Sequence, residues 1–173
     1  MSQFFDTLDS LPNPRVLFVN KQNEPVFAFS QSGVETLSYG PFVGDDILRW
    51  GEIERVFIIR RRLGSWRIPT IRLVNLDALL QRLSDDKSER LNRMYRSWRG
   101  GVGLDFKQVT EIRIEGTEIS VPTDNSYETD REWIFSRVVA RFKSMDIRTI
   151  DEGTPEYKLY IPEGDWRDYP VES

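Results

Sequence analysis

The chain contains no histidine and no cysteine among its 173 residues. Without histidine, it has neither the imidazole base of a Ser-His-Asp or Cys-His site nor an imidazole metal ligand. Without cysteine, it has no disulfide, thiolate nucleophile, zinc-thiolate cluster or iron–sulfur site. Catalysis would depend on carboxylates, lysine, tyrosine, serine and threonine, and we predict no metal or other cofactor.

Long apolar runs are missing as well. Uninterrupted apolar stretches reach only about five residues, whereas a transmembrane helix needs roughly 20. The first residues, Met1–Asp6, lack a basic region followed by an apolar stretch, so no secretory signal is predicted. The absence of cysteine agrees with a reducing compartment. We therefore predict a soluble, cytoplasmic protein without a transmembrane segment.

What the chain does contain is enough apolar and aromatic material for a core. Apolar residues make up 39% and aromatic residues 12% of the sequence, with ten Phe, six Tyr and five Trp. This composition argues against global disorder. The length fits one domain with extensions better than two domains.

The net charge of −4 is unevenly distributed. Residues 49–107 carry fourteen basic and seven acidic side chains, a net charge of +7. The preceding residues 1–48 carry −4 and the following residues 108–173 carry −7. A basic middle between acidic flanks indicates charged binding faces, or flanks that fold back onto the middle as ordinary surface charge.

Local patterns predict mostly strands, followed by a final helix. Alternating or β-branched segments favour strands and apolar residues at helical spacing favour helices. Pro69 predicts an edge position or a bulge in its strand. The predicted strands are 16–19, 26–29, 34–39, 53–60, 65–74 and a hairpin within 111–121; the predicted helices are 3–8, 77–83, 89–98 and about 18 residues from Asp130.

The last helix has the strongest pattern. Thr129 and Glu132 have the spacing of a capping box at its start. One wide apolar stripe indicates that the helix packs on another element; it comprises Ile134, Phe135, Val138, Val139, Phe142 and Met145. Beyond it, residues 147–173 are acidic and rich in Pro, Gly and aromatic residues. We predict an extended arm there, docked on the domain or on a partner.

The order of elements resembles bacterial pleckstrin-homology-like domains. Trp50, Ile53 and Val56 match the spacing of their "W-x-x-I-x-x-V" strand, and Leu76–Leu80 and Gly100-Gly101 flank a similar helical insertion. The resemblance covers about residues 15–146, between an N-terminal segment 1–14 and the arm. It implies an α+β fold, a strongly bent antiparallel sheet or barrel with a C-terminal amphipathic helix, in a bacterial protein. Many unrelated binding functions share such folds.

The sharpest basic cluster is Arg60-Arg61-Arg62, at the end of the strongest predicted strand. Basic residues on the first hairpin of eukaryotic pleckstrin-homology domains cradle inositol phosphates. The cluster could therefore clamp phosphate or an acidic partner, with Arg67 and Arg72 adding charge from the next strand. The alternative is a solvated hairpin end that blocks aggregation.

Other constellations argue against nucleic acid and against catalysis. Tyr95 and Trp98 lie on the apolar stripe of their helix, so the rings beside Arg93 and Arg96 are expected in the core and not free to stack on bases. The paired acids Asp45-Asp46 and Asp85-Asp86 suit turns or helix caps better than a glycosidase site. The Gly100–Gly103 run lacks the Lys-Ser/Thr of a phosphate-binding loop. We predict that the protein is not an enzyme.

The favoured hypothesis is a non-catalytic module for protein–protein recognition. Arginine and aromatic residues supply much of the binding energy in interfaces. The predicted partner-binding residues are Arg60, Arg61, Arg62, Arg67 and Arg72 on the basic face, and Tyr157, Tyr160, Trp166 and Tyr169 in the arm. One alternative is an immunity protein that blocks the active site of a cognate toxin. Another is peripheral binding of anionic lipid through the Arg-rich hairpin.

Overall fold

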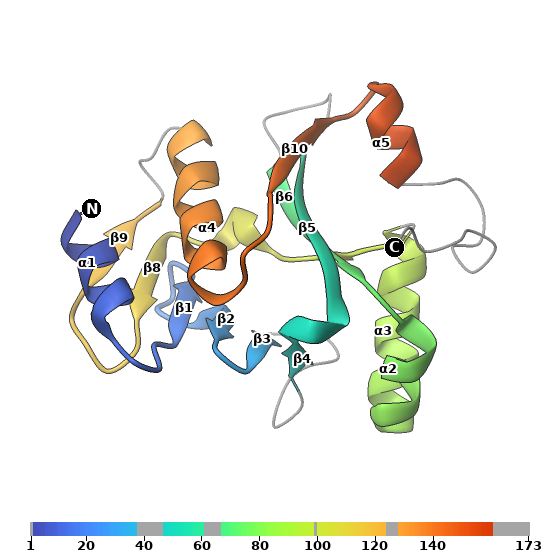
Figure 1. Cartoon of the computed structure of the whole chain (residues 1–173), viewed down its shortest axis with the longest axis horizontal. Helices are drawn as coiled ribbons and strands as arrows, with labels where there is room; N and C mark the ends of the chain where they lie inside the picture. The colour runs from blue at the N-terminus through green and yellow to red at the C-terminus, as the bar shows by residue number, and fades with distance from the viewer. Residues whose placement is uncertain (1, 38–46, 61–66, 99, 124–127, 161–173) are drawn as a thin grey trace. The chain divides into compact units, whose positions relative to one another are not determined.

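A computed structural model describes residues 2–37, 47–60, 67–98, 100–123 and 128–160, with the backbone alone for residues 67, 128–130 and 158–160. The fold is α+β, as predicted, with helices and two sheets (Figure 1). The chain divides into two compact units. Unit 1 comprises Met1–Trp50 and Gln108–Met145, and unit 2 comprises Gly51–Lys107 and Asp146–Ser173.

Unit 1 contains a six-stranded sheet in the order β4-β3-β2-β1-β8-β9, in which every pair is antiparallel. Its strands are β1 (Val16–Val19), β2 (Pro25–Ser30), β3 (Gly33–Thr36), β4 (Leu48–Arg49), β8 (Glu111–Ile114) and β9 (Ser120–Pro122). Its helices are α1 (Ser2–Ser10) and α4 (Glu128–Phe142), and the 3-10 turn η1 (Trp50–Glu52) leads from β4 into unit 2.

Stacked and edge-on aromatic rings pack together in the core of unit 1. Phe18 on β1 lies 4.3 Å from Phe27 and 5.0 Å from Phe29 on β2, between ring centroids. Phe135 from α4 contacts Phe29 at 5.8 Å. Aromatic pairs at these separations add to the free energy gained from burial alone. Helix α4 is therefore fixed on the sheet by the apolar stripe that its sequence predicts.

Gly33 allows β3 and β4 to approach closely. Its φ of +149° is unfavourable for residues with a side chain, and an added Cβ would lie 2.0 Å from the carbonyl oxygen of Leu48. Trp50, which follows β4, is held by two contacts: its Nε1 donates to the carbonyl of Ser30 at 2.7 Å, and its ring stacks on Phe142.

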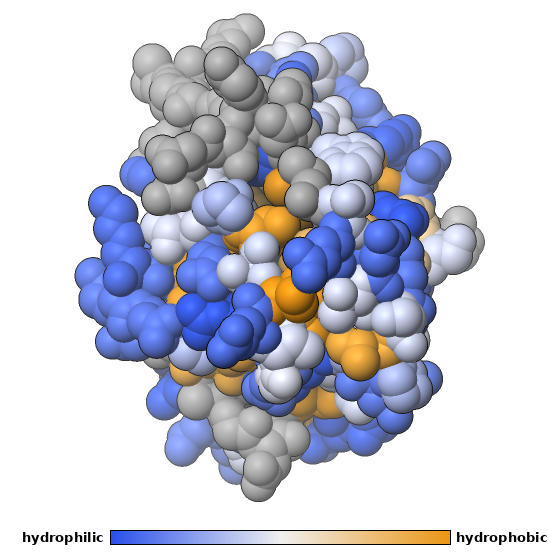
Figure 2. All heavy atoms as spheres, turned by 90° about the vertical axis from the view of Figure 1, so that its left-hand side faces the viewer, coloured by the Kyte–Doolittle hydropathy of each residue, from blue (hydrophilic) through white to orange (hydrophobic). Residues whose placement is uncertain are grey.

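Helix α1 packs beside α4. The ring of Phe5 lies edge-on to Trp133 at 5.1 Å, and Arg137 pairs with Asp9 at 3.1 Å. The Arg141 side chain also donates hydrogen bonds to two backbone carbonyls, that of Leu8 in the last turn of α1 and that of Leu11 just after the helix. Figure 2 shows the side of the molecule that carries α1, where apolar side chains lie between polar ones.

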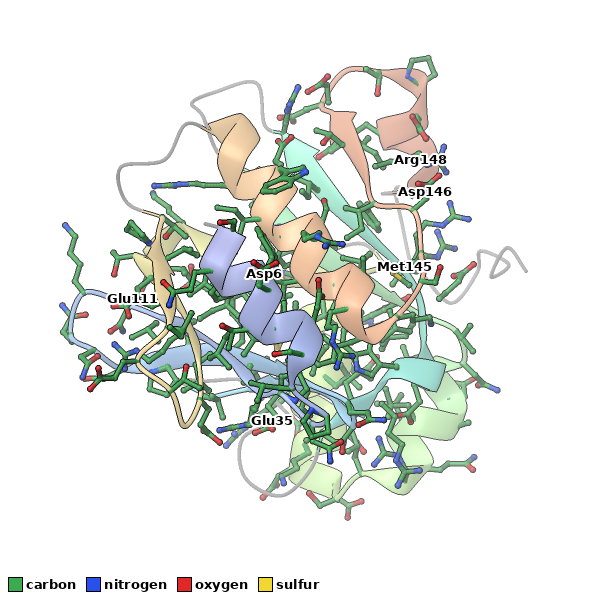
Figure 3. All side chains as sticks on the ribbon, turned by 60° about the vertical axis from the view of Figure 1, so that its left-hand side comes forward. Asp6, Glu35, Glu111, Met145, Asp146 and Arg148 are labelled. Carbon is green, nitrogen blue, oxygen red and sulfur yellow. The ribbon has the colours of Figure 1, made fainter. Side chains whose placement is uncertain are left out.

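An ion-pair network connects three strands of unit 1. Arg15, just before β1, donates to both carboxylate oxygens of Glu35 on β3 and also pairs with Glu115 after β8. Glu35 is labelled in Figure 3. These carboxylates raise the pKa of the Arg15 guanidinium above its ordinary value, and the hydrogen bond that Arg15 donates to Glu35 contributes most.

Unit 2 contains a four-stranded sheet in the order β10-β5-β6-β7. Its strands are β5 (Ile53–Arg60), β6 (Arg67–Leu73), β7 (Val102–Gly103) and β10 (Arg148–Asp151). Its helices are α2 (Leu76–Arg82), α3 (Asp85–Ser97) and α5 (Pro155–Tyr160), and the 3-10 turn η2 (Phe106–Gln108) ends its first chain stretch. The helices lie on one side of the sheet in Figure 1.

Capping and periodicity explain helices α2 and α3. Asn75 is the N-cap of α2, because its side chain accepts from the amide of Ala78. Asp85 and Asp86 lie in the first turn of α3, where acidic side chains interact favourably with the helix dipole. Leu79 and Leu91 are buried, as the apolar spacing predicts.

The finer features of the predicted fold differ from the structure. The strands of the described residues form two sheets, neither of which closes into a barrel, so the pleckstrin-homology-like architecture stays a prediction. Helix α4 begins at Glu128, which places Thr129 inside the helix and not at its cap. The irregularity of the β5–β6 ladder lies between Ile53 and Arg55 and not at Pro69.

The C-terminal segment also differs from a purely extended arm. Residues Arg148–Asp151 form β10, which runs parallel to β5, and Pro155–Tyr160 form α5. The predicted antiparallel sheet therefore contains one parallel pair in unit 2. No helix of the described residues is long and apolar enough to cross a membrane.

Candidate functional site

Two of the predicted basic residues occupy opposing positions at one end of unit 2. Arg60 is the last residue of β5 and Arg67 is the first residue of β6, and the ladder register pairs them directly. Arg61 and Arg62 lie outside the described residues. The backbone register therefore places two basic residues at directly opposite positions at the end of the ladder.

A carboxylate from β10 lies beside this end. In the parallel register, Asp151 is the partner of Arg60, and its Oδ1 lies 3.7 Å from the Arg60 Nη1. The Arg60 side chain is 34% exposed and that of Asp151 is 55% exposed. The amide of Glu152 donates to the carbonyl of Arg60 at 2.8 Å, so the backbone fixes the carboxylate next to the guanidinium. We call Arg60, Arg67 and Asp151 the hairpin-end cluster.

Arg72 is not part of the hairpin-end cluster. It lies five residues beyond Arg67 in β6, and an odd separation places the two positions on opposite faces of a strand. Its Nε lies 3.1 Å from the Oε2 of Glu54, and the two side chains are only 13% and 10% exposed. The contact is an ion pair without the geometry of a hydrogen bond.

A bulge explains how Glu54 reaches Arg72. Because Ile53 pairs with Leu73 and Arg55 pairs with Arg72, Glu54 is an extra residue without a partner in the ladder. A bulge redirects side chains relative to the regular alternation of a strand. Tyr95 of α3 covers this pair, and burial raises the pKa of its phenol above the ordinary value. The charge of Arg72 is thus engaged inside unit 2, and its predicted role with a partner stays a prediction.

The structure describes only some of the aromatic residues that were predicted to contact a partner. Tyr157 packs against a cluster of Phe57, Ile59 and Ile150, so part of its ring is used within unit 2. Tyr160 ends α5, and the structure describes its backbone alone. Trp166 and Tyr169 lie outside the described residues. The structure therefore brings the start of the arm next to the basic hairpin, although the two were predicted as separate surfaces.

Residues of helices α2 and α3 that were weighed as nucleic-acid contacts have partners within unit 2. Tyr95 is 3% exposed. The ring of Trp98 lies against Gly103, where an added Cβ would come within 3.0 Å of it. Arg82 is bound by both carboxylate oxygens of Glu52. Neither the Tyr95 ring nor the Arg82 guanidinium is presented for base stacking or phosphate contact.

Sequence reasoning missed Asp151 and Trp133. Asp151 ends a four-residue alternation, Arg-Thr-Ile-Asp, which is a short strand pattern in a segment interpreted as extended arm. Trp133 lies on α4 and is 53% exposed. Its position outside the apolar stripe already indicated that it would face away from the sheet.

Comparison of the chain with protein-family models, with curated proteins and with solved structures finds no match. Among the described residues, no group of three or more acidic side chains could hold a metal ion.

Proposed function

We propose that the chain is a non-catalytic recognition module that binds an acidic segment of a protein partner at the end of the β5–β6 ladder. The observation that carries the proposal is the direct pairing of Arg60 with Arg67, next to the carboxylate of Asp151. Arginine binds carboxylates in a planar, bidentate geometry. Within the chain, the Asp151 carboxylate already lies 3.7 Å from the Arg60 guanidinium, which supports attraction of carboxylates to this end of the ladder.

Acidic side chains around the cluster favour a protein partner over an anionic membrane. Asp151 ends the strand that pairs with β5, and Glu152 follows it directly, with its amide bonded to the carbonyl of Arg60. An anionic lipid surface presents one sign of charge over a wide area, and these carboxylates would be repelled by it. A protein segment can place its own charges so that potentials are complementary across the contact. Neutralisation of a toxin stays an alternative prediction.

The proposal is tested with a fluorescein-labelled decaglutamate peptide and the full chain. Fluorescence anisotropy at low salt should show saturable binding that weakens as salt is raised, because the contact is between charges. The double variant Arg60→Glu/Arg67→Glu should bind at least about tenfold more weakly, since charge-assisted hydrogen bonds contribute about 1.5–3 kcal/mol each.

The matched control is Arg90→Glu/Arg93→Glu, which makes the same change of net charge at two exposed positions on α3. It should bind the peptide nearly as well as the parent chain. Equal losses in both double variants would mean that only net charge matters and would contradict the proposal. Binding to vesicles containing phosphatidylglycerol, but not to the peptide, would favour the lipid alternative instead.

A further inference from the structure

The segment Arg148–Tyr160, which comprises β10 and α5, is docked on the same end of unit 2 that carries the basic pair. Its parallel ladder runs from the pairing of Arg148 with Phe57 to that of Asp151 with Arg60. Figure 1 shows β10 along β5, with α5 following it. The last pair of the β10–β5 ladder is therefore Asp151 with Arg60, and Arg60 is also the β5 member of the basic pair with Arg67.

Two different kinds of contact hold the segment. Ile150 and Tyr157 pack against Phe57 and Ile59, and this apolar cluster fixes the position of the segment. Arg148 pairs with Glu156 at 2.8 Å, which ties the strand to the helix within the segment itself. Asp151 is not part of the apolar cluster. Its carboxylate is largely exposed and adds charge at the end of an already anchored strand.

The position of Asp151 is the one that an acidic ligand of Arg60 would need. Its Oδ1 lies 3.7 Å from the Arg60 Nη1, close enough to attract the guanidinium but too far for a strong hydrogen bond. A carboxylate of a partner that approached Arg60 would be repelled by Asp151 and would compete with it for the guanidinium. The segment can thus weaken binding at this site without leaving β5.

We propose that Asp151 is an internal competitor that occupies the anion-binding position beside Arg60 and sets the affinity of the hairpin-end cluster for acidic partners. The inference rests on the proposed function and names its regulation. A partner that gives the Asp151 side chain another cation to bind, or that outcompetes it with several carboxylates, would engage the cluster. Ligands with a single carboxylate would bind more weakly than they would without Asp151.

The test is the affinity of the full chain for the labelled decaglutamate peptide in the variant Asp151→Asn. Asparagine keeps the size of the side chain and removes its charge. Binding should become about two- to fivefold tighter, the range expected for an exposed ion pair. In the Arg60→Ala background, Asp151→Asn should change the affinity much less, because the competition requires the guanidinium.

The matched control is Asp146→Asn, an equal change of charge in the same unit, before the start of β10, where Figure 3 labels Asp146. Asp146 lies five residues before Asp151, about 16 Å along an extended chain. It should alter the affinity less than Asp151→Asn does. Equal gains from the two variants would overturn the inference while the proposed function survives, provided that Arg60→Glu/Arg67→Glu still weakens binding at least about tenfold.

Other outcomes distinguish a failure of the proposed function from a failure of the inference about Asp151. If the parent chain and both asparagine variants bind the peptide equally whether or not Arg60 and Arg67 are reversed, the proposed function itself is wrong. A gain from Asp151→Asn that persists unchanged in the Arg60→Ala background would also overturn the inference, because the gain would then reflect net charge alone.

Discussion

At the scale of single residues, Glu111 has a charge that is stabilised by the fold. Its carboxylate accepts from the Arg113 Nε at 3.1 Å, two positions along β8. The hydrogen bond from Arg113, followed by one from Ser120, holds the pKa of Glu111 below its ordinary value against the opposing effect of burial. Figure 3 labels Glu111 on β8. A carboxyl group of this kind stabilises the folded state only when it is ionised.

We predict that Glu111→Gln lowers the free energy of unfolding at neutral pH and that the difference disappears in acid. The folded-state pKa lies below that of the unfolded chain, so the stabilisation is fully present above the unfolded value of about 4.3. It is lost as the pH falls through the lower folded-state pKa. Urea unfolding of both chains from pH 7 to pH 3 measures the difference.

Glu118→Gln provides the control, since Glu118 is an exposed carboxylate in the connection between β8 and β9. Its effect should be smaller at neutral pH. A Glu111→Gln defect that stayed constant down to pH 3 would show that packing, and not the carboxylate charge, is responsible.

At the scale of secondary-structure elements, β10 depends on one buried side chain. Ile150 is 2% exposed and belongs to the cluster with Phe57 and Ile59. The strand has four residues and pairs with β5 alone. Parallel ladders are slightly less stable per residue than antiparallel ones. The apolar contact, and not the ladder, should therefore hold β10 in place.

We predict that Ile150→Ala costs about 2–4 kcal/mol of local stability and loosens β10, because the cavity left by the side chain cannot fully collapse. Hydrogen exchange should accelerate at the amides of β10 and of Glu152. Ile150→Val, which removes one methylene, should cost about 1 kcal/mol. Unchanged exchange in Ile150→Ala would show that the ladder alone anchors the strand.

Several elements follow from local pattern alone. Strand β5 has the predicted ends, because its β-branched and aromatic run is bounded by charged residues and turn formers. Four residues of the predicted stripe of α4 are buried, whereas Phe142 is half-buried and Met145 lies beyond the end of the helix; the buried residues are Ile134, Phe135, Val138 and Val139. Helix α5 and strand β10 were not predicted. Their sequences are short and polar, so that packing on β5 and not local propensity stabilises them.

At the scale of the whole molecule, both units are built from two separate stretches of chain. Unit 2 combines Gly51–Lys107 with Asp146–Ser173. The second stretch supplies β10, which lies at one edge of the unit-2 sheet. A chain ending near residue 146, the predicted end of the domain, would therefore leave the edge of β5 without its neighbour.

We predict that removal of residues 147–173 destabilises unit 2 by at least about 3 kcal/mol, because Phe57 and Ile59 lose the apolar cover of Ile150 and Tyr157. The truncated chain should bind a hydrophobic dye and unfold at lower denaturant concentration. A chain ending at Tyr160, which keeps β10 and α5, should unfold at a higher denaturant concentration than the chain ending at residue 146. Equal unfolding of the chain ending at residue 146 and the full chain would contradict this.

In the candidate site, some features could be predicted from the sequence and others depend on the tertiary structure. The cluster Arg60-Arg61-Arg62 was visible because adjacent charges are a local property of the chain. Its neighbour Asp151 was not, because 91 residues separate it from Arg60. Likewise, Arg67 and Arg72 look equivalent in sequence. Only the bulge at Glu54 decides that Arg72 is engaged in a nearly buried ion pair.

The sequence by itself excluded imidazole and thiolate chemistry. It also determined the α+β class and most of the strands and helices. These depend on residue types and on spacings of two to four residues, which act locally. The tertiary structure alone decided the parallel placement of β10, the pairing of Arg60 with Asp151 and the engagement of Arg72. Each of these depends on contacts between distant segments, whose free energy appears only when the segments are folded together.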